Sequence, residues 1–134
     1  MDLVPQEKMP YNGRKGNFAN LRKRKAKKMV AKTYSMGLYG MEALPVEVEA
    51  DLSKGLPAFE LVGLPDAAVK ESRDRVRAAL KNCGFEFPVS RITMNLAPAD
   101  KQKEGPIYDL PLLLSLLKAY HQLECQTDDA VFLG

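Results

Sequence analysis

The feature that most constrains the fold is an apolar helix near the C-terminal end of the chain. Residues 110–123, LPLLLSLLKAYHQL, carry leucine on every side of the predicted helix rather than along one stripe. A helix of this kind has no face for water, so other elements must enclose it. The length of 134 residues and the 46% of hydrophobic residues suit a single domain with one core.

Strand patterns supply the elements that could enclose it. In the stretch 43–52, Val46, Val48 and Ala50 alternate with acidic residues, which predicts a strand with one face in water. Similar short patterns, bounded by glycine and proline turns, occur at residues 31–40, 58–62 and 91–96. Because the first three strands follow one another with turns between them, we expect the sheet to begin antiparallel.

A second helix is predicted within residues 64–84, LPDAAVKESRDRVRAALKNCG. Pro65 and Asp66 suit its first turn, and Gly84 suits its C-terminal cap. Glu71 is placed to pair with Arg75 one turn on. Its apolar side comprises Val69, Val76, Ala79, Leu80 and Cys83. Strands and helices together predict an α+β fold.

The net charge of +3 divides unevenly along the chain. Residues 1–28 hold nine Lys or Arg against two acids, or +7, and the rest holds eleven against fifteen, or −4. This polar tail has no apolar period, and we expect it to be disordered. It is either an extension ahead of a natural start at Met29 or a nucleic-acid-binding arm that uses Arg22, Lys23, Arg24 and Lys25.

A second basic group lies on the helix predicted at 64–84. Lys70, Arg73, Arg77 and Lys81 form a stripe beside its apolar side, with Asp74 among them. The stripe is either a nucleic-acid or partner surface or an ordinary solvated helix face, since exposed helices normally carry mixed charge.

The turn KEGPIYD, residues 103–109, is the other candidate site. A phosphate loop needs GxxxxGK[ST], whereas this turn has one glycine and a lysine ahead of it. We interpret Lys101, Lys103 and Glu104 as a solvated loop and Asp109 as a helix N-cap. Nor do the two cysteines, Cys83 and Cys125, form a metal motif, and we expect both to be small buried residues. No cofactor is therefore expected in this chain.

Two blocks of the sequence resemble a known family. Residues 55–88 and 91–117, with GLPAFELVGLPDAAVKESRDRVRAALKNCGFEFP, RITMNLAPAD and KEGPIYDLPLLLSLL, closely resemble the N-terminal domain of magnesium-chelatase-like AAA+ ATPases, the ComM/YifB competence family. The likeness runs from about Met29 to Gly134. It implies that residues 1–28 are an extension, that 29–134 hold an incomplete N-terminal domain, and that the chain stops before the ATPase module.

The resemblance also implies a fold for the chain and a role for the turn at residues 103–109. The fold would be a two-layer β-α-β sandwich similar to the Lon proteolytic domain and to the second domain of a ribosomal protein. Lon-type proteases place a nucleophilic serine in a similar turn, and the alignment of residues 103–106 puts Ile107 at that position. Ser115 is a poor substitute, because a hydroxyl inside a helix tends to bond to its own backbone. Lys103, Glu104, Gly105, Pro106 and Asp109 are therefore a family signature, and no enzyme activity is expected of this chain.

For full-length relatives, the resemblance implies ring-forming AAA+ proteins that use ATP and Mg²⁺ for helicase or branch-migration work in transformation and recombination. The implied partners are DNA, the AAA+ module and further copies of the protein. A cytoplasmic location without a membrane is expected. The alternative is a small stand-alone nucleic-acid-binding protein that relies on its basic tail.

Overall fold

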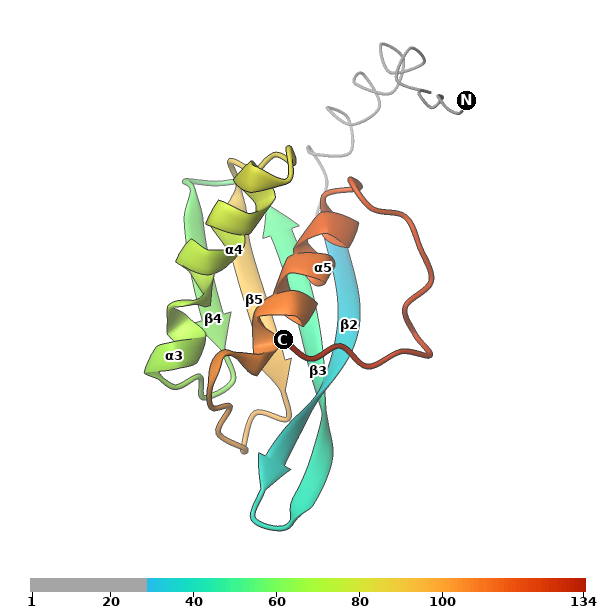
Figure 1. Ribbon diagram of the computed structural model, residues 1–134. Helices are drawn as coiled ribbons and strands as arrows, with labels where there is room; N and C mark the ends of the chain where they lie inside the picture. The colour runs from blue at the N-terminus through green and yellow to red at the C-terminus, as the bar shows by residue number, and fades with distance from the viewer. Residues whose placement is uncertain (1–28) are drawn as a thin grey trace.

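The computed structural model describes residues 29–134 and contains a four-stranded mixed sheet whose helices lie on one face (Figure 1). This arrangement confirms the α+β class, whereas the likeness to the Lon domain stays a prediction. The basic tail lies outside the described residues. In chain order, the elements are β2 (Met29–Tyr39), β3 (Glu42–Ser53), β4 (Ala58–Val62), α3 (Ala67–Lys70), α4 (Ser72–Asn82), β5 (Arg91–Ala97), the 3-10 helix η1 (Pro106–Tyr108) and α5 (Asp109–Ala119).

The strand order is β2-β3-β5-β4. β2 and β3 form the expected antiparallel pair, and β5 is antiparallel to β3. The expectation fails at β4, which forms a parallel pair with β5 and is not hydrogen-bonded to β3. A parallel pair needs a crossover connection, and the chain between β4 and β5 supplies it through α3 and α4.

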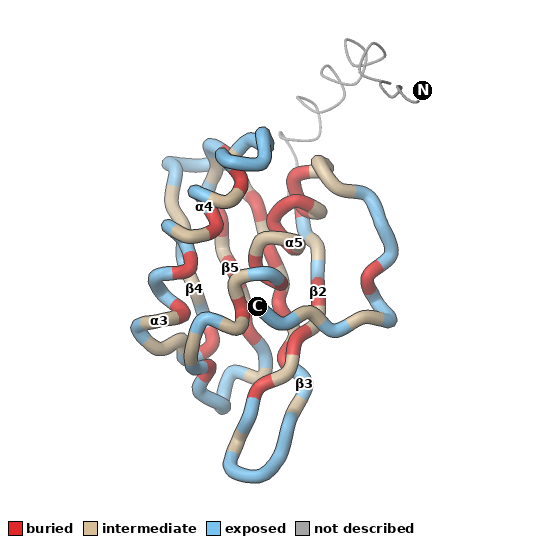
Figure 2. Tube along the Cα trace, viewed as in Figure 1, coloured by how far each residue is buried: buried red, intermediate tan, exposed pale blue. Residues whose placement is uncertain are grey.

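The core lies between the sheet and the helices (Figure 2). Val46, Val48 and Ala50 are fully buried, as their alternation predicts. The acidic residues between them, Glu47 and Glu49, are half-buried on the uncovered face of the sheet.

Helix α5 packs against β2 and β3 and beside α4. Leu112, Leu116 and Leu117 are buried, so the predicted enclosure of this helix is confirmed, although Leu110 remains 37% exposed at its first turn. None of the helices within residues 29–134 is long and apolar enough to cross a membrane.

Ser115 does not bond to its own helix, contrary to the prediction. Its hydroxyl lies 3.0 Å from the Val48 carbonyl oxygen and 2.7 Å from the Thr33 hydroxyl, which itself lies 2.8 Å from the Pro111 carbonyl oxygen. The reason is its position on the buried side of α5, where the sheet presents polar partners.

The helical region after β4 is two helices rather than one, with α3 ending at Lys70 and α4 beginning at Ser72. The predicted pair between Glu71 and Arg75 is present at 3.5 Å, and Gly84 adopts a φ of 81° just beyond the helix. Both cysteines are exposed, so their predicted burial is wrong. Cys83 follows the last turn of α4, where the chain leaves the core.

Candidate functional site

The turn at 103–109 is held against the start of α3 by backbone hydrogen bonds. The Lys103 N–H donates to the Leu64 carbonyl at 3.0 Å, and the Lys103 carbonyl accepts from the Asp66 N–H at 2.9 Å. The Lys103 side chain is completely buried and its amine donates to the Pro98 carbonyl. The interpretation of Lys103 as part of a solvated loop is therefore wrong, because the pairing with residues 64–66 draws this side chain inward.

The buried amine has an altered acidity. Burial lowers the pKa of Lys103, and the nearby carboxylate of Asp100 opposes that shift only in part. The lysine is a structural donor to a backbone carbonyl, not an amine that faces solvent.

Asp66, not Asp109, supplies the capping carboxylate. One oxygen of Asp66 accepts from the Val69 N–H at 2.8 Å and so caps α3. The other oxygen accepts from the Gly105 N–H at 3.1 Å, so the same side chain also fixes the turn. Gly105 has a φ of 82°, a conformation that suits glycine.

Asp109 is the first residue of α5 and makes no capping bond, which corrects the sequence prediction. Its two carboxylate oxygens instead accept from Arg75 of α4, at 2.5 Å from Nε and 3.1 Å from Nη2. A hydrogen bond to this carboxylate raises the pKa of Arg75. A two-pronged guanidinium competes well against a backbone N–H for a carboxylate, and here it joins the two helices.

The remaining residues of the turn differ in exposure. Ile107 is half-buried against the core, and Glu104 is exposed. Tyr108 is 1% exposed, and burial raises its pKa to about 12, with a further contribution from Tyr39. Residues 29–134 contain no group of three or more His, Cys, Asp or Glu side chains that could hold a metal ion.

The basic stripe of α3 and α4 is exposed along its whole length. Arg73 lies 3.2 Å from the carboxylate of its neighbour Asp74. The Arg77 guanidinium lies 4.5 Å from the centroid of the Phe87 ring. Two members of the stripe, Arg73 and Arg77, thus share one setting, a hollow in the surface. Lys70 and Lys81 do not line this hollow. Arg22, Lys23, Arg24 and Lys25 lie outside the described residues.

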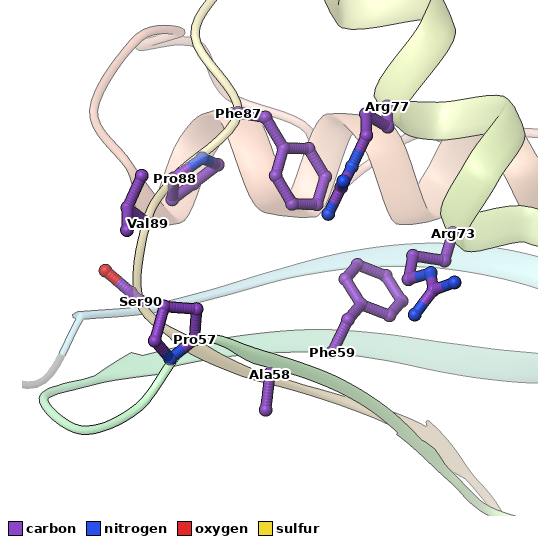
Figure 3. Close-up of a pocket in the computed structure, with 9 residues that line it drawn as sticks. All are labelled: Pro57, Ala58, Phe59, Arg73, Arg77, Phe87, Pro88, Val89 and Ser90. Atoms are coloured by element: carbon purple, nitrogen blue, oxygen red, sulfur yellow. The ribbon is translucent and has the colours of Figure 1, made fainter.

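That setting is a hollow of about 370 Å³ between β4, α4 and the segment that leads into β5 (Figure 3). The rings of Phe59 and Phe87 both line it and stack on each other, with centroids 6.1 Å apart and planes at 26°. The sequence prediction missed both rings, although the phenylalanine-rich stretch FEFP at 85–88 is a local signal for Phe87. The hollow is lined by Pro57, Ala58, Phe59, Arg73, Arg77, Phe87, Pro88, Val89 and Ser90. We call it the Arg–Phe groove.

Comparison with known proteins places these features in a family. Residues 48–134 match the family model described as subunit ChlI of Mg-chelatase. The uncharacterized protein YifB of Escherichia coli is 56% identical over 84 residues, which cover 63% of this chain and 17% of that protein. The competence protein ComM of Haemophilus influenzae is 50% identical over 95 residues, or 71% of this chain and 19% of that protein.

The uncharacterized protein YifB of Salmonella typhimurium is 48% identical over 101 residues, or 75% of this chain and 20% of that protein. The chain thus spans about a fifth of the length of the curated relatives it matches. On the strength of the match over residues 48–134, the chain belongs to the family of subunit ChlI of Mg-chelatase.

Proposed function

We propose that this chain is a non-catalytic domain of a ComM-like AAA+ protein, with the N-terminal position and Lon-like fold that the resemblance implies. The observation that carries the proposal is the structure of the turn at residues 103–109. Lys103, its only amine, is buried on a backbone carbonyl, and Ile107 occupies the position at which a catalytic relative would need a nucleophile. The carboxylates of Asp66 and Asp109 both serve structural contacts.

The proposed role is assembly of the larger protein and contact with DNA. ATP and Mg²⁺ would act in the AAA+ module of full-length relatives, where hydrolysis in a ring would drive helicase or branch-migration work on DNA. The similarity to ComM, a protein named for competence, supports the proposed role, because the two are 50% identical over most of this chain.

A domain exchange tests the assignment. In Haemophilus influenzae, residues 29–134 should replace the matching segment of ComM and restore transformation to at least roughly a tenth of the parental frequency. Deletion of the same segment is the matched control. A chimera that transforms no better than the deletion would contradict the proposed role.

A chemical test addresses the absence of catalysis. The full chain should remain unlabelled by a fluorophosphonate probe under conditions that label a serine peptidase of the Lon type. Labelling that disappears when the chain is denatured would identify an activated serine, and the domain would then have to be treated as an enzyme.

The second candidate is a stand-alone nucleic-acid-binding protein, and the charge of +7 within residues 1–28 favours it. Affinity for nucleic acid falls with salt in proportion to the phosphates neutralised. Deletion of residues 1–28 should then flatten the salt dependence of DNA binding. An unchanged slope after the deletion would remove this candidate.

A further inference from the structure

We propose that the Arg–Phe groove binds an unpaired nucleobase together with a flanking phosphate, and so holds single-stranded nucleic acid. The inference deepens the DNA-contacting role proposed above and rests on it. It assigns that contact to one site formed by β4, α4 and the segment before β5, rather than to the basic stripe in general.

The aromatic wall provides the base-binding half of the site. Phe59 and Phe87 are only half-buried, and both border a hollow of about 370 Å³ that opens to solvent. Rings in this state are suited to stacking, because every nucleobase has a flat π-face and stacking needs no particular sequence. The guanidinium carbon of Arg77 lies 4.5 Å from the Phe87 centroid, so a cation adjoins the aromatic wall (Figure 3).

The arginines provide the phosphate-binding half. Arg73 and Arg77 are one helical turn apart, a rise of about 6 Å along α4, and both border the same hollow. Within residues 29–134, the ion-pair partner of Arg73 is Asp74, and the two side chains are 50% and 74% exposed. An exposed pair of this kind contributes little, so a phosphate can displace it. Lys81, one turn beyond Arg77 on α4, extends the same line of charge to about 12 Å.

The uncovered face of the sheet is a poorer candidate for this contact. It carries Glu47, Glu49 and Glu60, and its basic residues Lys32 and Arg91 are already paired at 3.1 and 2.8 Å. Phosphates would meet negative charge there. The Arg–Phe groove combines two stacked rings with guanidinium groups, whereas Lys101 over Tyr39 is a single cation on a single ring, and rings with cations are what single-strand binding sites use.

The test measures binding of the full chain to a fluorescent 20-nucleotide oligothymidylate, by anisotropy at several salt concentrations. The double variant Arg73→Gln/Arg77→Gln should reduce the slope of log affinity against log salt by about 1.4, because each phosphate contact on a single strand contributes about 0.7. The matched control, Lys32→Gln/Lys101→Gln, removes the same charge from exposed sites that do not line the groove.

A second variant isolates stacking. Phe87→Leu keeps an apolar side chain in the groove and should weaken oligothymidylate binding at least roughly fivefold. Its affinity for a duplex of equal length should not change, since paired bases are not free to stack on Phe87. A circular-dichroism melt of each variant verifies that the chain is still folded.

Four outcomes would overturn the proposal. The control double variant could change the salt slope as much as the arginine variant, which would indicate diffuse charge rather than a site. Phe87→Leu could leave single-strand affinity unchanged. A poly-glutamate peptide could bind with the same dependence on Arg73 and Phe87 while oligothymidylate binding shows none, which would make the groove a peptide site. If the ComM chimera restores transformation even with these variants, the groove inference fails while the proposed function stands.

Discussion

The buried hydroxyls of Thr33 and Ser115 permit a sharp test of the packing between α5 and the sheet. Both side chains are 0% exposed and make three short contacts, to each other, to the Pro111 carbonyl and to the Val48 carbonyl. Two hydroxyls carry only two protons, so only two of the three contacts are hydrogen bonds at any moment.

This proton count fixes the expected energies. Ser115→Ala leaves the Thr33 hydroxyl on the Pro111 carbonyl, and Thr33→Val leaves the Ser115 hydroxyl on the Val48 carbonyl. Each variant therefore loses one hydrogen bond, or about 1 kcal/mol of the free energy of unfolding. The double variant loses two, about 2 kcal/mol, with a coupling energy near zero.

Three simultaneous bonds would give a different pattern. Each single variant would then lose two bonds, about 2 kcal/mol, and the double variant three, so the coupling energy would be about 1 kcal/mol. Urea unfolding followed by far-ultraviolet circular dichroism measures these values, since the chain has no tryptophan to report by fluorescence. A coupling energy near or above 1 kcal/mol would refute the proton count.

Four other contacts support predictions of similar scope. Arg75→Lys cannot make both bonds to the α5 carboxylate and should lower the free energy of unfolding by roughly 0.5–1 kcal/mol, measured by urea midpoint. Lys103→Met should be at least as stable as the parent at pH 7. Its advantage should shrink as pH rises toward 10.5, because the lowered pKa makes the parent's stability increase over that range. The pKa of Tyr108 is raised from 10.0 to about 12 in the folded chain. The parent's free energy of unfolding should therefore fall by about 2–3 kcal/mol as the pH rises from 10 to 12, and Tyr108→Phe should remove this fall in thermal melts. Gly63→Ala would place a Cβ 2.0 Å from the Leu96 carbonyl oxygen at a φ of 113°, and should abolish the cooperative melt.

Matched variants separate these effects from general damage. Gly84→Ala also meets a positive φ, but no atom lies within 4 Å of its Cβ, so it should melt cooperatively. Arg91→Lys changes an exposed pair and should alter the unfolding free energy less than Arg75→Lys. The reasoning on Lys103 would be contradicted by a Lys103→Met variant whose difference in stability from the parent is the same at every pH.

Local periodicity predicted much of the fold. The alternation around Val48 identified the buried face of β3, and the helical spacing of Val69, Val76 and Leu80 identified the buried side of α3 and α4. Such patterns can be recognised in a sequence because the core-facing residues of a helix or strand recur with the period of that element. The order of the strands is a different matter, since the position of β5 between β3 and β4 depends on the packing of α4 over the sheet.

The candidate site was less predictable because its contacts join distant segments. Asp109 has the sequence position of a cap, yet Arg75, 34 residues earlier, takes its carboxylate. The Arg–Phe groove likewise needs Phe59 of β4 to meet Phe87 of the segment that leads into β5. The local sequence indicates a capping preference of about 1 kcal/mol for Asp109, but it does not contain Arg75, the partner that competes for the carboxylate.

The geometry of the turn shows why its shape and its chemistry are separable. Its backbone is fixed by the Lys103 pairing with residues 64–66 and by the bond from Gly105 to Asp66, and neither contact involves the side chain at position 107. The amine of Lys103 is buried and donates to the Pro98 carbonyl, so it serves the fold of the turn. A change of side chain at position 107 would therefore leave the path of the backbone through the turn in place.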